Sequence, residues 1–189
     1  MTTLAPTIYT RTFPRAASWL RDVTLIVLGA LFVAALAQVK IALPFTPVPL
    51  TGQTFAVLLV GAALGSKRGA ASMGLYIALG ALGLPVFAGG AAGLAYLSGA
   101  TLGYLIGFVM AAYVIGLLAE RGLERSVRTS ILPFLVGTLI IYVCGVAWLA
   151  VVLGSFSKAI TAGLLPFLIG DAIKLAAASL ALPAAWRLV

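Results

Sequence analysis

The sequence of 189 residues lacks histidine altogether and contains one cysteine and four acidic residues. Without histidine the chain cannot use His-based general acid–base catalysis, Ser-His or Cys-His nucleophile pairs, or most kinds of zinc site. The single cysteine, Cys144, cannot form an intrachain disulfide. No glycine-rich turn ends in Gly-Lys-Ser or Gly-Lys-Thr, which excludes a nucleotide-binding loop of that kind. We therefore expect no catalytic residue, no metal site and no cofactor.

Charge is also scarce, because 8% of the residues are charged whereas 63% are hydrophobic. Soluble domains carry about 25% charged residues, and the mean hydropathy of +1.20 points instead to a protein that has the lipid bilayer as its solvent. The formal net charge is +8. The basic residues are nevertheless too few and too scattered to form a nucleic-acid-binding stripe, so we expect no nucleic-acid partner.

The spacing of the charges predicts six membrane-spanning helices. A spanning helix needs about 20 apolar residues, and the charge-free stretches can be counted in units of that length. The prolines of residues 41–52 and the glycines of residues 85–99 predict long, apolar outer loops 1 and 3. We expect an all-α, polytopic single domain over residues 1–189, with residues 1–21 as a cytoplasmic N-terminal segment. The expected spans are approximately residues 22–40, 53–66, 70–84, 100–119, 130–153 and 165–186.

The distribution of basic residues predicts the orientation. With both termini in the cytoplasm, the outer segments hold only Lys40 and Lys158. The positive-inside rule favours this arrangement strongly. The basic residues that then lie inside are Arg11, Arg15, Arg21, Lys67, Arg68, Arg121, Arg125, Arg128 and Arg187.

Small residues recur four positions apart in three of the expected helices. Such spacing allows helix backbones to approach closely inside a membrane. We expect internal helix packing at most of these positions, which are Ala30 and Ala34, Gly61 and Gly65, and Gly103 and Gly107.

Asp171 and Lys174 are the ionisable residues well inside an expected span. Such groups are costly in a bilayer and usually face a cavity or a partner. Three residues apart on a helix, they share a face. A rise of about 1.5 Å per residue places them roughly 9 and 14 Å below the outer boundary. They are therefore candidates for a ligand site, and the alternatives are a structural ion pair and a proton relay.

The outer loops carry a family resemblance. LPFTPVPLTGQTFAVLLVGAALG, GLPVFAGG followed by GYLIGF, and GDAIKLA together resemble the BioY family, the biotin-binding membrane subunits of energy-coupling-factor vitamin importers. The resemblance extends from about residue 30 to residue 174. It implies a six-helix subunit that captures biotin from outside and works with a transmembrane coupling protein and a pair of cytoplasmic ATPases.

The resemblance also implies site residues. Asp171 and Lys174 would line the biotin site, Gly89 and Gly90 would form a glycine loop, and Tyr96 would follow them. From the chemistry of the residues we add Gln53, whose amide can donate and accept near the mouth of the site. The resemblance implies contact with the coupling protein at Ala30 and Ala34.

The chain departs from the family pattern at two polar positions. Many relatives carry asparagine where this chain has Ala91, and some carry arginine where it has Leu105. Three alternatives stay open: a stand-alone carrier, a homo-oligomer that moves biotin or another small molecule, and a membrane scaffold without a ligand. The residues also leave open which end of biotin meets Asp171 and which meets Lys174.

Overall fold

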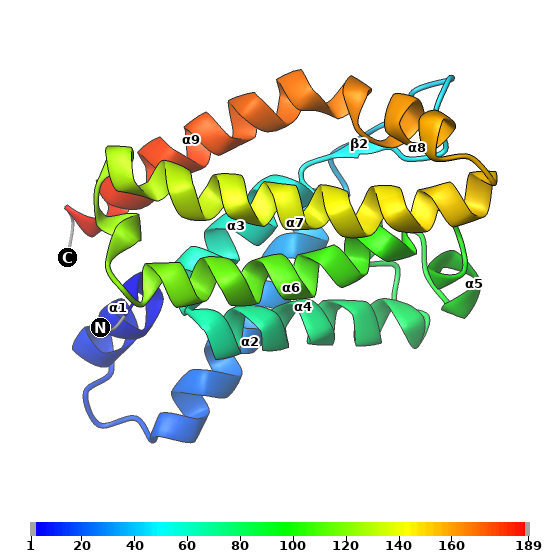
Figure 1. Cartoon of the computed structure of the whole chain (residues 1–189). Helices are drawn as coiled ribbons and strands as arrows, with labels where there is room; N and C mark the ends of the chain where they lie inside the picture. The colour runs from blue at the N-terminus through cyan, green and yellow to red at the C-terminus, as the bar shows by residue number, and fades with distance from the viewer. Residues whose placement is uncertain (1–2, 188–189) are drawn as a thin grey trace.

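Six of the helices coincide with the charge-poor segments of the sequence (Figure 1). The structure is a computed structural model that describes residues 3–187, so the first two residues of the expected N-terminal segment and the last two of the expected domain lie outside the described residues. The six helices are α2 (Ser18–Ala37), α3 (Gln53–Leu64), α4 (Ser66–Ala81), α6 (Leu102–Ala119), α7 (Val127–Leu153) and α9 (Leu168–Trp186).

The shorter elements correct the all-α expectation in detail. Within loop 1 the chain forms a two-stranded antiparallel ribbon in which Lys40 pairs with Thr51. A helix stands in the N-terminal segment, and another stands between the fifth and sixth expected spans, where the sequence pattern indicated only a connection. These elements are α1 (Leu4–Thr12), β1 (Lys40–Ile41), β2 (Leu50–Thr51), α5 (Leu94–Leu97), η1 (Leu123–Arg125), α8 (Phe156–Gly163) and η2 (Leu165–Phe167).

Four helical stretches in the described part of the chain are long and apolar enough to cross a membrane. They are α2, α6, α7 and the stretch Phe156–Trp186, with mean hydropathies between 1.6 and 2.4. The helix α3 is apolar but has 12 residues, and α4 has 16. The structure therefore confirms a mostly helical, multi-span protein.

The two ends of the bundle differ. The N and C marks lie at one end in Figure 1, while α5 and α8 lie at the opposite end. Large apolar side chains are exposed along the outer faces of the long helices, for example Leu28, Leu139 and Ile173. Such faces suit a hydrocarbon environment, because in lipid they carry no hydrophobic penalty.

Glycines bring the central helices into contact. A Cβ added at Gly103 would lie 2.4 Å from the carbonyl oxygen of Cys144, and one at Gly107 would lie 2.9 Å from the Cα of Ile141. Between α3 and α6, a Cβ at Gly61 would lie 3.0 Å from the Cα of Ala112. The backbones of α6 and its neighbours therefore meet directly, as in small-residue membrane packing.

The corner between α3 and α4 is packed against α6. Gly65 turns the chain with a φ of +85°, which favours glycine. The carboxylate of Glu120 accepts hydrogen bonds from the backbone N–H of Ser66 at 2.7 Å and from its hydroxyl at 2.8 Å. The first turn of α4 is thereby capped by an acidic side chain from the end of α6, which also suits the helix dipole.

This corner leads to a first prediction. A Cβ at Gly116 would lie 2.2 Å from the backbone nitrogen of Ser66, so Gly116→Ala must displace α6 from the corner. We expect a loss of about 1–3 kcal/mol of stability, measured as a lower thermal unfolding midpoint of the purified protein in one detergent. Gly74→Ala is the control, because a Cβ there meets nothing within 4 Å. Equal midpoints for the two variants would contradict the packing described.

Candidate functional site

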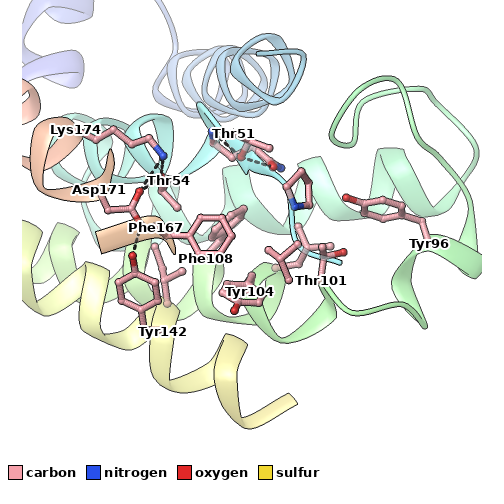
Figure 2. Close-up of a pocket in the computed structure, with 15 residues that line it drawn as sticks. Thr51, Thr54, Tyr96, Thr101, Tyr104, Phe108, Tyr142, Phe167, Asp171 and Lys174 are labelled. Atoms are coloured by element: carbon pink, nitrogen blue, oxygen red, sulfur yellow. Dashed lines mark hydrogen bonds and ion pairs between the residues drawn. The ribbon is translucent and has the colours of Figure 1, made fainter. Parts of the chain in front are cut away.

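A small pocket lies where the ends of several helices meet loop 1 (Figure 2). Its cavity volume is about 50 Å³. The side chains come from loop 1, from α3, α6, α7 and α9, and from the α5 and η2 segments. The polar lining residues are Thr51, Gln53, Thr54, Tyr96, Thr101, Tyr104, Tyr142, Asp171 and Lys174, and the apolar ones are Val48, Pro49, Leu105, Phe108, Ile141 and Phe167.

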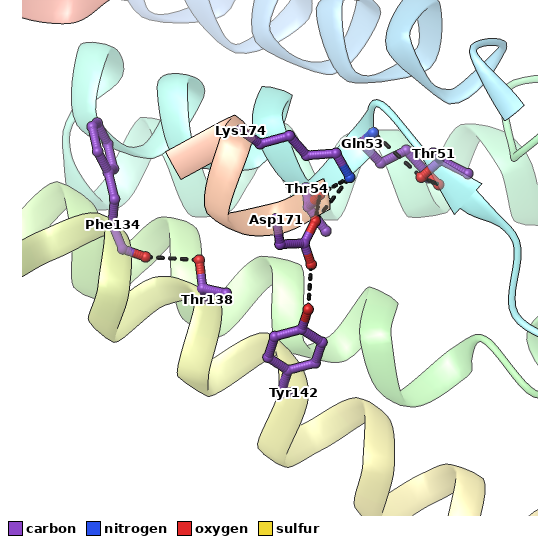
Figure 3. Close-up of polar contacts among 8 residues, drawn as sticks. All are labelled: Thr51, Gln53, Thr54, Phe134, Thr138, Tyr142, Asp171 and Lys174. Carbon is purple, nitrogen blue, oxygen red and sulfur yellow. Dashed lines mark hydrogen bonds and ion pairs between the residues drawn. The ribbon is translucent and has the colours of Figure 1, made fainter. Parts of the chain in front are cut away.

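An ion pair forms one end of the pocket (Figure 3). The ammonium of Lys174 lies 2.8 Å from Oδ1 of Asp171, and the two side chains are 18% and 8% exposed. Both belong to α9, where a spacing of three residues places them on one face. Asp171 also lies in the first turn of α9, where the helix dipole stabilises a negative charge.

Two hydroxyl groups complete this polar cluster. Thr54 of α3 donates to Oδ1 of Asp171 at 3.0 Å and accepts from the ammonium of Lys174 at 2.9 Å. Tyr142 of α7 donates to Oδ2 of Asp171 at 2.5 Å. Asp171 therefore connects three helices, and both of its oxygens are engaged.

The ammonium of Lys174 keeps one donor available. Its three N–H groups can make three hydrogen bonds, and among the described residues it bonds to Asp171 and Thr54. The remaining donor can bind a carboxylate or carbonyl oxygen of a ligand. Such a charge-assisted bond is among the stronger hydrogen bonds in proteins.

Gln53 is held at the start of α3. Its side-chain oxygen accepts from the Thr51 hydroxyl at 2.9 Å, and its side-chain nitrogen donates to the Tyr76 hydroxyl at 2.6 Å. Tyr76 is fully buried, and Gln53 is 6% exposed. The amide therefore lines the pocket in a fixed orientation.

Tyr96 lies at the end of the pocket away from Asp171, as Figure 2 shows. Its ring stacks on Phe87, with centroids 4.7 Å apart and planes 15° apart. Phe87 in turn meets Tyr76 edge to face at 5.6 Å. Stacking of this kind orients aromatic rings, so the buried side chains Phe87 and Tyr76 position Tyr96.

Gly89 and Gly90 do not line the pocket. Both have left-handed backbones, with φ of +70° and +78°. The N–H of Gly89 donates to the carbonyl of Ala37 at 3.2 Å, and a Cβ on Gly89 would lie 2.7 Å from Cδ of Lys40. Gly89 therefore fastens loop 3 (residues 85–99) to the end of α2, whereas the N–H of Gly90 donates to the carbonyl of Phe87 at 3.0 Å within that loop.

Ala30 and Ala34 pack within the bundle, as the small-residue spacing predicted, rather than forming the partner surface that the resemblance implied. Ala30 is 1% exposed and belongs to the core of the chain, and Ala34 is half-buried against that core. The carbonyl of Ala34 accepts from the side chain of Gln38 at 2.9 Å. The exposed face of this part of α2 is formed instead by residues such as Leu31 and Phe32.

Sequence reasoning missed several residues of the pocket. Thr54 directly follows Gln53, which was an expected site residue, so the position of Gln53 could have pointed to Thr54. Tyr104 lies in the GYLIGF segment that carries the family resemblance, which was a usable signal, whereas Tyr142 gave none because it is one of several aromatic residues in a long charge-free stretch. The hydroxyl of Tyr104 donates to the carbonyl of Gly163 at 2.7 Å, which ties α6 to α8.

The fold and the site define a class, namely a multi-pass cell-membrane protein whose helices enclose a small pocket with an ion pair at one end. The chain belongs to the BioY family, whose model matches residues 7–189.

Named relatives and a solved structure resemble the chain. A protein of Pyrococcus horikoshii named probable biotin transporter BioY is 42% identical over 158 residues, which cover 84% of this chain and 91% of the relative. The biotin transporter BioY of Thermotoga maritima is 44% identical over 140 residues, which cover 74% and 82%. The crystal structure of the S-component for biotin from an ECF-type ABC transporter superimposes with a TM-score of 0.81 at 26% identity, covering 89% of this chain and 92% of the other.

The ion pair leads to a stability prediction. Asp171→Leu leaves the ammonium of Lys174 without its carboxylate in an apolar setting, so we expect a loss of about 3 kcal/mol of stability. The double variant Asp171→Leu with Lys174→Met removes both charges, and we expect it to regain most of that loss. Thermal unfolding in detergent measures both effects.

A control for this prediction is the half-exposed pair of Asp22 and Arg68. Asp22→Leu removes an ion pair that has access to polar surroundings, so it should cost about 1 kcal/mol or less. If the double variant at Asp171 and Lys174 is as unstable as Asp171→Leu alone, the ion pair is not the origin of the loss.

Proposed function

We propose that this chain binds biotin and is the substrate-binding subunit of an energy-coupling-factor type transporter. The observation that carries the proposal is the likeness to the S-component for biotin, which extends over 89% of this chain. The names of the BioY relatives give the same substrate. The proposed role is binding and uptake without catalysis, and the chain supplies no nucleotide-binding loop of its own.

The chemistry of the pocket suits biotin. Biotin offers two ureido N–H donors and a carbonyl at one end, and a carboxylate beyond an apolar chain at the other. The carboxylate of Asp171 can accept the N–H groups, and the spare donor of Lys174 can bind an oxygen. Phe108 and Phe167 supply apolar walls between these groups and Tyr96.

The proposed binding residues are therefore Asp171, Lys174, Tyr96 and Gln53. We propose an indirect role for Gly89 and Gly90 in the loop that carries Tyr96, because Gly89 fastens that loop to Ala37 and Gly90 bonds to Phe87, on which Tyr96 stacks.

The pocket must widen to admit the ligand. Ligand sites usually measure about 300–1,000 Å³, whereas this cavity measures about 50 Å³. The segments that can give way are loop 1, which contributes Val48 and Pro49, and loop 3 (residues 85–99), which contributes Tyr96. We propose that both loops act as lids.

We propose that six helices cross the membrane, with both termini in the cytoplasm. The short helices α3 and α4 would then complete the set of spans as a packed pair joined at Gly65. This orientation puts nine basic residues inside and two outside, as the positive-inside rule favours.

The proposed partners are a transmembrane coupling protein and a pair of cytoplasmic ATPases. Because Ala30 is buried, contact on α2 would fall on its exposed side, next to Ala34 and including Leu31. Through this contact, the free energy of ATP hydrolysis by the ATPases would reach the chain, which has no nucleotide-binding loop of its own.

Biotin binding tests the proposal directly. Saturable binding of radiolabelled biotin to the purified chain is expected. Asp171→Asn and Lys174→Ala should each raise the Kd roughly tenfold to a hundredfold, because each removes a charged hydrogen-bonding partner. Asp22→Asn is the matched control, because its carboxylate lies at the opposite end of α2 from loop 1 and pairs with Arg68.

The outcomes separate the functions. If biotin at micromolar concentration shows no saturable binding, the proposal is wrong and a scaffold is favoured. If both site variants bind biotin normally, the site is wrong although the function stands. Uptake of biotin in cells that lack coupling proteins would favour a stand-alone carrier or oligomer over a subunit.

The orientation has its own test. In a Cys144→Ala background, Lys158→Cys should react with a membrane-impermeant maleimide in intact cells. Arg128→Cys, at the other end of α7, should react only after the cells are opened. Both side chains are exposed, so access to the reagent depends on the side of the membrane. The reverse pattern would overturn the proposed orientation.

A further inference from the structure

Lys40 lies where the two loops that cover the pocket meet. In the ribbon of loop 1, Lys40 is paired with Thr51, and residues opposite each other on antiparallel strands project their side chains to the same face. Thr51 lines the pocket, whereas Lys40 is exposed beside it. The side chain of Lys40 rests on loop 3, because a Cβ added at Gly89 would lie 2.7 Å from its Cδ and 3.2 Å from its Nζ. The ammonium of Lys40 is therefore held at the rim of the pocket, between the two loops.

This part of the rim belongs to the Tyr96 end of the pocket. Phe87, two residues before Gly89, stacks on Tyr96 with ring centroids 4.7 Å apart. The side chain of Gln38, two residues before Lys40, donates to the carbonyl of Phe87 at 3.4 Å. Residues 38–40 and 87–89 therefore lie against each other next to Tyr96, which is itself at the end of the pocket away from the ion pair.

The ammonium of Lys40 has no anionic partner within the described part of the chain, where it forms no ion pair. The chain has four acidic residues, and each of them is engaged elsewhere. Asp22 pairs with Arg68, Glu120 bonds to Ser66, Glu124 lies near Arg125, and Asp171 pairs with Lys174. The positive charge of Lys40 is therefore available to an anion from outside the chain.

The opposite end of the pocket suits a neutral group better than a carboxylate. Asp171 and Lys174 together carry no net charge, and both are largely buried. A ligand carboxylate at Lys174 would lie beside the carboxylate of Asp171, and like charges repel strongly where little water is present. The ureido ring of biotin is neutral, and its N–H groups and carbonyl can bond to both residues. With the ring at the ion pair, the carboxylate of biotin lies toward Tyr96.

We propose that Lys40 binds the carboxylate of biotin and makes the chain prefer biotin to its neutral derivatives. The inference rests on the proposed function. Among the described residues that line the pocket, Lys174 is the only cation, so a carboxylate at the Tyr96 end needs a cation from the rim. The flexible stem of a lysine lets its ammonium turn from loop 3 toward the ligand. Because Lys40 belongs to loop 1 and rests on loop 3, its bond to the ligand holds both loops over the occupied pocket.

Biotin and biotinamide, in which a neutral amide replaces the carboxylate, test this role. The Kd of each ligand is measured for the purified full chain and for Lys40→Met, which keeps an apolar side chain of similar length. We expect Lys40→Met to raise the Kd of biotin about fivefold or more and that of biotinamide less than about twofold, because only biotin loses an ion pair. Lys40→Arg, which keeps the charge, should restore most of the affinity for biotin.

Lys158→Met is the matched control. Lys158 is also exposed and forms no ion pair in the described part of the chain, but it belongs to α8, none of whose residues line the pocket. This variant should leave both Kd values unchanged, and unfolding midpoints establish that each variant is folded.

The outcomes separate the role of Lys40 from the proposed function. If Lys40→Met weakens the binding of both ligands equally, or of neither, Lys40 does not bind the carboxylate and the inference is wrong. Equal effects of Lys40→Met and Lys158→Met on biotin would also overturn it, because they indicate a general effect of surface charge. If the unsubstituted chain binds neither biotin nor biotinamide, the proposed function itself is wrong, and the inference falls with it.

Discussion

The buried contact between Asp171 and Lys174 is the constraint on which the arrangement of the helices depends. An isolated charge in hydrocarbon is costly, so the carboxylate and the ammonium must stay together and keep their hydrogen bonds. Thr54 from α3 and Tyr142 from α7 supply those bonds. A polar cluster in a lipid-solvated chain therefore determines how α3, α7 and α9 meet, although it involves few residues.

Away from this polar cluster, the helices are held together by close packing. Lipid provides no hydrophobic drive between helices, so close packing has to come from small residues. Gly103 and Gly107 let α6 approach α7, and Gly61 lets α3 approach α6. These contacts fix one side of the pocket. The other side consists of loop 1 and loop 3 (residues 85–99). Loop 1 is tied to the bundle by the hydrogen bond from Thr46 to the carbonyl of Ala162, and loop 3 by the hydrogen bonds from Gly89 to Ala37 and from Gly93 to Gly80. The pocket thus has a floor of closely packed helices beneath a cover of two loops.

The sequence predicted those features that depend on charge. Asp171 and Lys174 stood out because apolar surroundings make ionisable residues conspicuous, and the resemblance added Tyr96. Tyr142 could not be predicted, because its role depends on which face of α7 points toward α9. A helix that is apolar on all sides has no polar and apolar faces from which that orientation could be read. At Ala30 the small-residue spacing predicted packing within the bundle and the resemblance implied a partner surface; the structure buries Ala30, as the spacing predicted.

The engaged state of Asp171 bears on selectivity. Because both oxygens of Asp171 already accept hydrogen bonds within the chain, a ligand gains only the difference between its own bonds and those it displaces. A ligand with N–H donors can replace the hydrogen bonds that the hydroxyls of Thr54 and Tyr142 donate to Asp171. A ligand of similar size without donors leaves the carboxylate partly unpaired in apolar surroundings, and such a mismatch gives stronger discrimination than shape alone. In the proposed role, these internal hydrogen bonds of Asp171 would contribute to selection, since any ligand would have to replace the bonds that it removes.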